Sequence, residues 1–236
     1  MFSAAAVALI VLPAGAAEVR DHPRAVVELF TSEGCSSCPA ADARLVELQK
    51  QPDVIALAYH VDYWDYIGWV DGFGTKANSD RQKSYAQSWG SSRIYTPELI
   101  VNGLKGVVAS KQDQVDAALS AATLAVPVSL DAENNALEIT VPAHGGSGEA
   151  MLWLVTFKDH ASVAIDRGEN AGQTIDYAQI VMHRQMLGMW DPVAGTHLKL
   201  PLSDVMTDGS NGAVVLVQTE KQGLPGPILG AASIQL

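Results

Sequence analysis

The first part of the chain alternates short apolar runs with a segment of helical periodicity. One apolar run covers residues 25–31 and ends in a Ser-Glu-Gly turn, and a second run covers 54–61. Between the two runs, Ala41, Leu45 and Leu48 recur at helical spacing with charged residues among them. This pattern predicts strand, helix and strand, a unit that normally makes a right-handed parallel crossover.

The pattern continues with an aromatic loop at 62–74 and a polar helical stretch near 76–89. An apolar strand at 98–101 is followed by Asn102-Gly103, a dipeptide typical of a tight hairpin turn, and the return strand is expected at 106–109. A helix at 112–122 closes the unit. This order of elements is that of a thioredoxin fold, so an α/β thioredoxin-like domain is predicted over 18–124.

Beyond residue 125 the pattern changes to short runs in which apolar and polar residues alternate, separated by turn residues. Eight such runs are present, and alternation of this kind is typical of strands with one solvated face. We therefore expect an all-β, antiparallel sandwich-like domain over 125–236, packed beside the first domain.

The first 17 residues carry no charge, and they contain an apolar run shorter than the roughly 20 residues that a membrane helix needs. Small residues at 14–16 have the spacing of a cleavage site. A basic segment before the apolar run is missing. The stretch is interpreted as a signal peptide, which predicts a periplasmic or secreted protein; the alternative is a buried N-terminal strand or helix.

The formal net charge is −11, and no Lys/Arg cluster occurs anywhere in the sequence. A nucleic-acid partner would need a basic face, and an anionic membrane surface is disfavoured for the same reason. We expect neither partner for the mature chain. The oligomeric state is left open.

The chain has only two cysteines, Cys35 and Cys38, separated by two serines. A disulfide that closes so short a loop removes little chain entropy, so a redox pair is the better explanation in an oxidising compartment. Cys35 lies where a turn leads into the predicted helix, whose unpaired N–H groups stabilise a thiolate, and Pro39 suits the first helical turn. We expect Cys35 to be exposed and anionic and to attack a disulfide of a partner protein. Cys38, deeper in the helix, would then resolve the mixed disulfide. No organic cofactor is expected.

Thr96-Pro97 precedes a strand some sixty residues after the first cysteine. At this place we expect a cis peptide bond that faces the cysteine pair and shapes the backbone for an extended substrate, with Thr96 among the substrate-binding residues. An ordinary trans proline at the start of an edge strand is the alternative.

The end of the second strand supplies further candidates. His60 and Asp62 point to one face of a strand and could act together as a proton shuttle or as metal ligands, although a lone strand histidine is more often structural. Trp64 and Tyr66, with other aromatic residues of this loop, could form an apolar rim that binds substrate, or could pack against the second domain.

Two polar segments outside the loop are further candidates. Arg81, Gln82 and Tyr85 share one helical face, which could complete the wall of the site or contact solvent. The polar turn 167–170 could reach the cysteine site or form a plain structural turn, and Gly168 suits a positive φ.

Several segments together resemble one family. FTSEGCSSCPAAD, YHVDYWDYIGWVDGFG, RQKSYA, YTPELIVNG, RGENAGQTIDY and LGMWD are similar to the DUF1223 family of secreted bacterial thioredoxin-like proteins of unknown function. The resemblance covers nearly the whole mature chain, and it implies a thioredoxin-like domain with a C-terminal β extension. It carries over only Cys35, Cys38 and the inferred cis-proline Pro97. The Gly-Pro pair of thioredoxin is replaced here by Ser36-Ser37, so the direction of electron flow stays open.

Three classes of function fit these residues. The first is an exported thiol-disulfide oxidoreductase that acts on protein thiols and disulfides of the cell envelope. The second is a metal-handling protein in which two thiolates and His60 hold Cu(I). The third is a non-catalytic binding or scaffold protein whose disulfide only rigidifies a turn.

Overall fold

The computed structural model describes residues 17–146 and 148–236. All but the last residue of the predicted signal peptide therefore lies outside the described residues. Within the described part, no helix combines the length and the apolar character needed to cross a membrane.

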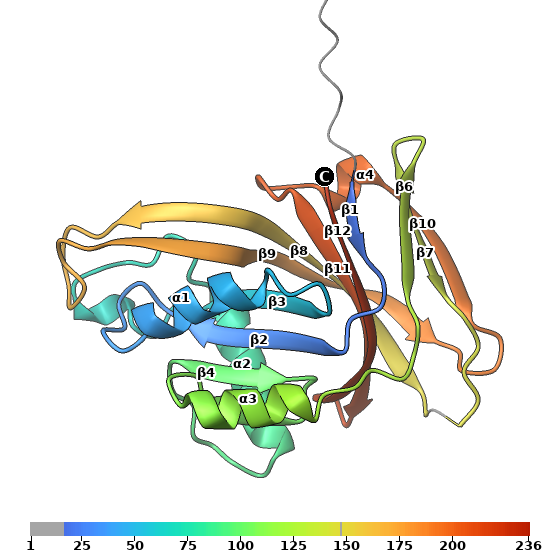
Figure 1. Ribbon diagram of the computed structural model, residues 1–236, viewed down its shortest axis with the longest axis horizontal. Helices are drawn as coiled ribbons and strands as arrows, with labels where there is room; N and C mark the ends of the chain where they lie inside the picture. Colours follow the sequence, from blue (N-terminus) through green and yellow to red (C-terminus); the bar gives the residue numbers. More distant parts are fainter. Residues whose placement is uncertain (1–16, 147) are drawn as a thin grey trace, which may run out of the picture.

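Most strands belong to one mixed sheet of nine strands, in the order β1-β12-β11-β8-β9-β3-β2-β4-β5 (Figure 1). A second, antiparallel sheet has the order β10-β7-β6. The elements of the first part are β1 Glu18–Arg20, β2 Ala25–Thr31, α1 Pro39–Leu48, β3 Val54–His60, the 3-10 helix η1 Asp65–Ile67, α2 Lys76–Ser88, β4 Glu98–Val101, β5 Lys105–Val108 and α3 Gln112–Ser120. Those of the second part are β6 Ser129–Glu133, β7 Ala136–Val141, β8 Ala150–Ala164, β9 Thr174–Trp190, β10 Thr196–Pro201, α4 Leu202–Val205, β11 Gly212–Lys221 and β12 Leu224–Gln235.

The first part of the chain follows the order of elements that the sequence predicts. β2 and β3 are parallel and α1 connects them, while β4 runs antiparallel to β2 and forms a hairpin with β5. Asn102 and Gly103 make the hairpin turn with φ of 49° and 67°, as their dipeptide indicates.

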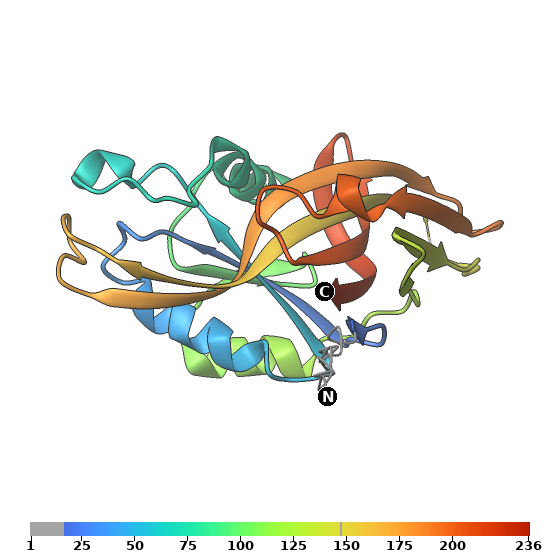
Figure 2. The same cartoon turned by 90° about the horizontal axis from the view of Figure 1, so that it is seen from above.

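Helices cover both faces of this part of the sheet. α1 and α3 lie on one face and α2 on the other (Figure 2). Side chains of β2 alternate between the two cores: Val27 and Leu29 pack with the α1 and α3 side, whereas Val26 and Phe30 pack with the α2 side. Because both faces are covered, every residue of β2 is buried.

The second part of the chain differs from the expected separate sandwich. β8, β9, β11 and β12 continue the first sheet, because β9 pairs with β3 in parallel and β1 adds to the far edge beside β12. Only β6, β7 and β10, among the described strands, form a sheet of their own, and they enclose a second core against β8, β11 and β12. The division at residues 124 and 125 stays a prediction.

Seven described strands take the place of the eight expected after residue 125. The reason is the length of β8, which extends over 162–164, the first half of the run 162–167 that the alternation pattern treats as a strand of its own. β8 and β9 form a long hairpin whose tip lies beside the start of α1 and the aromatic loop (Figure 1). This tip brings residues from 165–173 to the cysteine pair.

Candidate functional site

Cys35 and Cys38 form a disulfide at the N-terminus of α1, with their Cα atoms 5.4 Å apart. Cys38 is the N-cap of the helix, Pro39 is its first residue, and no side chain caps the first turn. The two intervening serines are exposed. Free N–H groups at a helix start favour negative charge, so the helix is placed to stabilise a cysteine thiolate.

The expectation that the Cys35 sulfur is exposed is wrong in this structure. Cys35 is 1% exposed and Cys38 is 0% exposed. Two segments distant in sequence, the aromatic loop and the tip of the β8–β9 hairpin, pack around the turn that carries Cys35. Sequence periodicity describes only the helix, so it gives no sign of these neighbours.

Trp64 lies on one side of the disulfide. A Cβ on Gly34, the residue before Cys35, would come within 3.3 Å of the Trp64 Cβ, so the two residues are in close contact. The Trp64 indole Nε1 donates a hydrogen bond of 2.7 Å to the Thr96 hydroxyl oxygen. Trp64 thus joins the turn before Cys35 to the loop before Pro97.

Ser37 connects the same loop to the sulfur. Its hydroxyl oxygen lies 3.4 Å from the Cys35 sulfur, and it donates to the Thr96 carbonyl oxygen at 3.5 Å. The Thr96-Pro97 peptide bond is cis, which confirms the expected conformation. Thr96, Pro97 and Trp64 are therefore assembled beside the cysteines, whereas Tyr66 on η1 is 82% exposed and has no described contact with them.

The hairpin tip closes the other side of the site. Asn170 is buried, and its side-chain amide donates to the carbonyl oxygens of Glu33 at 2.8 Å and Cys35 at 3.1 Å. Gly168 has φ of 82°, as expected for this turn, and a Cβ there would approach the Trp69 Cβ to 3.1 Å. Of the two interpretations of the turn 167–170, the structure supports contact with the cysteine site.

A cluster of buried polar groups lies next to the disulfide-bearing turn. His60 Nδ1 and Asp71 Oδ2 are 2.8 Å apart, and both side chains are fully buried. The Glu33 backbone N–H donates to Asp71 at 2.8 Å, and the Glu33 carboxylate accepts a 2.6 Å hydrogen bond from Trp69. The pairing of His60 with Asp62 that the sequence suggests is not found, because β3 ends at His60 and Asp62 instead bonds Ser79 at 2.5 Å.

Asp42 belongs to the same cluster. It lies one helical turn after Cys38, its backbone N–H donates to the Cys38 carbonyl oxygen at 3.0 Å, and its Oδ1 accepts from the Thr31 hydroxyl at 2.7 Å. Its second oxygen has no described partner, and neither has His60 Nε2, Glu33 Oε1 or the Tyr177 hydroxyl. These unpartnered atoms make the cluster electrostatically unusual.

Burial and mutual repulsion shift the ionisation of these acids. Burial raises the pKa of Asp42 to about 7, although His60 and the Thr31 hydrogen bond oppose the shift. Burial and the Asp71 charge also raise the pKa of Glu33. Burial acts to lower the pKa of His60, but the Asp71 charge and hydrogen bond outweigh it, so the pKa of His60 is raised.

One group of ligand atoms could hold a metal ion. Glu33, His60 and Asp71 each offer one such atom, all within 4.8 Å of one another. Two of the three are carboxylates, which suit hard cations or zinc rather than Cu(I). Asp71 already accepts hydrogen bonds from His60, Glu33 and Phe73, so the cluster satisfies much of its own bonding capacity. The Cu(I) set of two thiolates with His60 is not assembled, because the sulfurs are bonded to each other and His60 pairs with Asp71.

The predicted polar face of α2 is a buried network instead of a pocket wall or a solvated face. Arg81 binds Glu28 of β2 at 2.6 Å and 2.8 Å, and Tyr85 donates to the same carboxylate at 2.5 Å. Gln82 donates to Glu98 at 2.7 Å. The helix is held to the sheet by these polar contacts.

Several residues of the site escaped prediction: Ser37, Asp42, Asp71 and Tyr177. Asp42 had a usable signal, since Cys38, Asp42 and Leu45 follow one another at helical spacing and therefore share a face. Asp71 and Tyr177 had no such signal, because they belong to a loop and to a distant hairpin that long-range packing brings to the site.

Comparisons with known proteins place this site in a family. A model described as "Protein of unknown function (DUF1223)" matches residues 26–218. The chain belongs to the DUF1223 family. The matched range includes the cysteine pair, the Thr96-Pro97 loop and the β8–β9 hairpin, so the whole site lies inside the family's sequence.

Two solved structures are similar to this DUF1223 chain. The crystal structure of protein AGR_C_4864 from Agrobacterium tumefaciens has 36% sequence identity and a TM-score of 0.81, covering 92% of this chain and 95% of that one. HBP35 of Porphyromonas gingivalis has 14% identity and a TM-score of 0.61, covering 92% of this chain and 76% of that one, which shows a shared fold alone. Among curated proteins, none matches the chain.

Proposed function

We propose that this protein is an exported thioredoxin-like thiol-disulfide oxidoreductase that exchanges disulfides with envelope proteins through Cys35 and Cys38. The observation that carries the proposal is a disulfide across two exposed serines at the uncapped start of α1. So small a ring contributes little chain entropy to stability, whereas the helix start favours the thiolate that exchange requires. The β-α-β unit, the β4–β5 hairpin and α3 support the thioredoxin-like assignment.

The exchange is balanced in two steps. A substrate thiolate attacks the Cys35 sulfur, the Cys35–Cys38 bond breaks, and Cys38 leaves as a thiolate. A second thiolate of the same substrate then attacks the mixed disulfide and releases Cys35. Two electrons pass from the substrate dithiol to the cysteine pair, and the two thiolates take up protons from solvent; the reverse sequence oxidises the pair.

Access to Cys35 requires its surroundings to move. Ser37 and Thr96 are in contact at the site, and the indole of Trp64 bonds to Thr96. We assign to Trp64 the role of a cover that must leave before a substrate reaches the sulfur. The Trp64 side chain is half-buried, and its one described side-chain hydrogen bond is the one to Thr96.

The Thr96→Val variant tests this cover. It removes the hydrogen-bond acceptor of Trp64 while keeping the shape of the side chain. A hydrogen bond contributes about 0.5–1.5 kcal/mol, so reduction of the disulfide by dithiothreitol should be about twofold to tenfold faster. Thr140→Val on β7 is the matched control and should leave the rate unchanged; an unchanged rate for Thr96→Val would contradict the role of Trp64.

The Cys38→Ser variant tests exchange itself. Without the second sulfur, mixed disulfides on Cys35 should accumulate in the cell envelope and disappear in the Cys35→Ser/Cys38→Ser variant. Non-reducing electrophoresis followed by mass spectrometry measures them. Absence of adducts, with a Cys35 pKa near the ordinary thiol value of about 8.5, would exclude the redox proposal.

Burial of both sulfurs favours a second candidate, a binding protein whose disulfide only shapes a turn. Such a disulfide should stay oxidised in a glutathione buffer and should resist dithiothreitol in both the unchanged protein and the Thr96→Val variant. The two experiments above separate this candidate from the first.

A further inference from the structure

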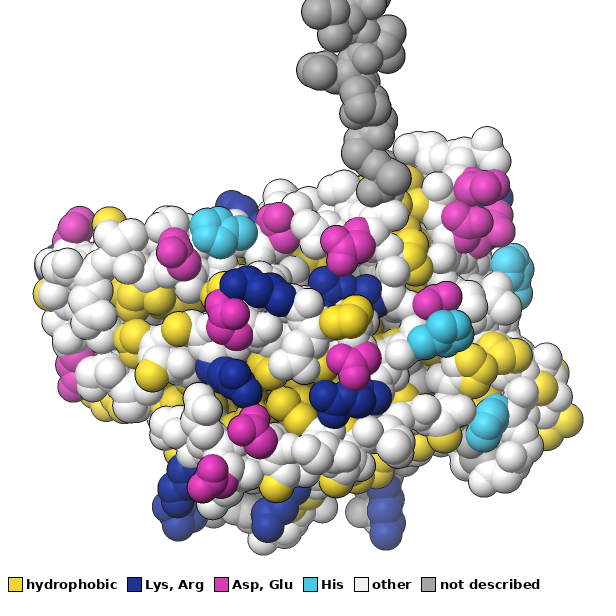
Figure 3. Space-filling model, viewed as in Figure 1, with side chains coloured by type: hydrophobic (Ala, Val, Ile, Leu, Met, Phe, Trp, Pro, Cys, Tyr) yellow, Lys and Arg dark blue, Asp and Glu magenta, His cyan; other side chains and the backbone are white. Residues whose placement is uncertain are grey.

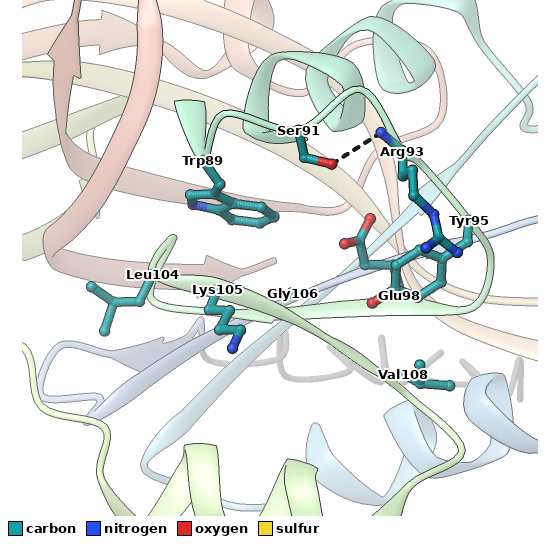
Figure 4. A pocket seen from close by; sticks show the side chains of 9 residues that line it. All are labelled: Trp89, Ser91, Arg93, Tyr95, Glu98, Leu104, Lys105, Gly106 and Val108. Atoms are coloured by element: carbon teal, nitrogen blue, oxygen red, sulfur yellow. Dashed lines mark hydrogen bonds between the residues drawn. The ribbon is translucent and has the colours of Figure 1, made fainter. Parts of the chain in front are cut away.

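A groove runs along the open edge of the nine-stranded sheet, away from the disulfide. One hollow of about 690 Å³ lies among Trp89, Tyr95, Leu104, Lys105 and Val108 (Figure 4). A second hollow of about 580 Å³ continues it and shares Trp89 and Leu104 with the first. We call the two together the β5 groove; each has the size of an ordinary ligand site.

The backbone of one wall is available for pairing. β5 is the last strand of the sheet and pairs with β4 alone among the described strands. Its residues are exposed or half-buried, in contrast to the buried residues of β4. An extended chain can add to such an edge through main-chain hydrogen bonds, and neighbouring pockets then select its side chains.

The side chains of the first hollow are mainly apolar and cationic, and the second hollow adds one acid, Glu220, and one cation, Lys221. Trp89 and Tyr95 are half-buried, and Leu104 is 58% exposed, which leaves apolar surface uncovered. Arg93 lies near Tyr95 and Lys105 near Leu104 (Figure 4), and both cations are exposed.

The one acid of the first hollow is already engaged. Glu98 is 5% exposed, and its carboxylate accepts a 2.7 Å hydrogen bond from Gln82. Gly106 leaves room for it, since a Cβ there would meet Glu98 Oε1 at 2.1 Å. Burial raises the pKa of Glu98. In a protein with a net charge of −11, with acidic side chains scattered over the face that Figure 3 shows, the first hollow thus presents two exposed cations and one buried acid.

We propose that the β5 groove binds an extended, acidic polypeptide segment of a partner protein as an additional strand on β5. Apolar side chains of the segment would contact Trp89 and Leu104, and its carboxylates would face Arg93 and Lys105. The near end of the groove is Tyr95, the neighbour of Thr96 in the loop beside the disulfide. Binding needs no sulfur chemistry, so the inference goes beyond the proposed function.

The test uses a blocked, cysteine-free octapeptide in which valine and tyrosine alternate with glutamate. Calorimetry should show binding, and amide hydrogen exchange should show new protection at 105–108. The Arg93→Glu/Lys105→Glu variant should bind about tenfold more weakly, because two attractive contacts become repulsive. Lys158→Glu, a single substitution of the same type on β8 outside the groove, should bind as the unchanged protein does. Binding should also weaken from 50 to 500 mM salt.

Two further probes make the result decisive. The same peptide with lysine in place of glutamate should bind at least tenfold more weakly. N-acetylglutamate should not compete with the peptide for the groove. If it competes as well as the peptide itself, and the β5 amide hydrogens gain no protection from exchange, the groove is a small-anion pocket and strand addition is wrong. The Cys35→Ser/Cys38→Ser variant should bind the peptide unchanged, so a failure of the redox proposal leaves this result standing. Absence of binding by the unchanged protein would overturn the inference.

Discussion

Replacing Arg81 with methionine is expected to lower the free energy of unfolding by about 3 to 5 kcal/mol. Arg81 and Glu28 are both buried, and their closest atoms are 2.6 Å apart. Methionine keeps most of the volume of the arginine stem but leaves the Glu28 carboxylate in the core without its cation. Removal of one partner from a buried ion pair is costly because the remaining charge has lost both its hydration and its counter-charge.

The network around this pair explains why the effect should be cooperative. Gln218 of β11 donates to the Tyr85 hydroxyl at 2.8 Å, and Tyr85 donates to Glu28. Arg81 also lies 4.8 Å from the centre of the Tyr85 ring. The network therefore connects α2, the interior strand β2 and a strand of the second part of the chain, so its loss should loosen all three.

Urea denaturation followed by circular dichroism measures the change. Lys76→Met on the same helix is the matched control, because Lys76 pairs with Asp80 at the surface and should affect stability little. If Arg81→Met does not fold, the Glu28→Gln/Arg81→Met variant, which removes both charges, should restore much of the stability. Equal loss of stability in Arg81→Met and Lys76→Met would show that the pair is not a structural element of the core.

Local patterns in the sequence predict the first part of the fold well. The apolar runs become β2 and β3, the helical spacing becomes α1, and Asn102-Gly103 becomes the β4–β5 turn. Each of these features depends on neighbours within a few residues, so the sequence contains the information in a readable form. The same holds for the position of the cysteines at a helix start.

The joining of the two parts into one sheet could not be predicted in this way. Strand alternation shows which face of β9 is buried, but the contact between Ala58 of β3 and Ile180 of β9 joins residues more than 100 positions apart. The parallel pairing covers an edge of β3 that the first part alone would leave open. No local signal distinguishes a strand that completes a neighbouring sheet from one that belongs to a separate sandwich.

The candidate site was predictable only as far as its local residues. Cys35, Cys38 and Pro97 follow from spacing, and Trp64 and Thr96 were expected beside them. Burial of the sulfurs depends on the hairpin tip with Asn170 and on the loop with Trp64, whose positions come from long-range packing. His60 pairs with Asp71 instead of Asp62 for the same reason, because the loop after β3 folds back over the histidine.

The Asp42→Asn substitution should reduce the change in the free energy of unfolding between pH 4 and pH 8 by about 2 to 4 kcal/mol. Asp42 titrates near its ordinary value of 3.8 in the unfolded chain, whereas burial raises its pKa to about 7 in the folded protein. The folded state therefore binds the Asp42 proton more tightly than the unfolded state does. The stabilising effect of this proton on the fold is full below pH 4. This effect is lost as pH rises through 7, because the buried carboxyl must then ionise without a partner for its second oxygen. Asparagine is neutral throughout, so the variant should be close to the unchanged protein at pH 4 and relatively more stable at pH 8.

Urea denaturation at a series of pH values measures this difference, with Glu47→Gln on the exposed side of the same helix as control. The control should follow the pH dependence of the unchanged protein. Parallel curves for Asp42→Asn and the unchanged protein would show that Asp42 is ionised in the folded state at pH 5, and the acid cluster next to the disulfide would then carry more negative charge than its burial indicates. A reduced slope would instead place a proton on the carboxyl one helical turn from Cys38, where it limits the repulsion that a Cys38 thiolate would meet during exchange.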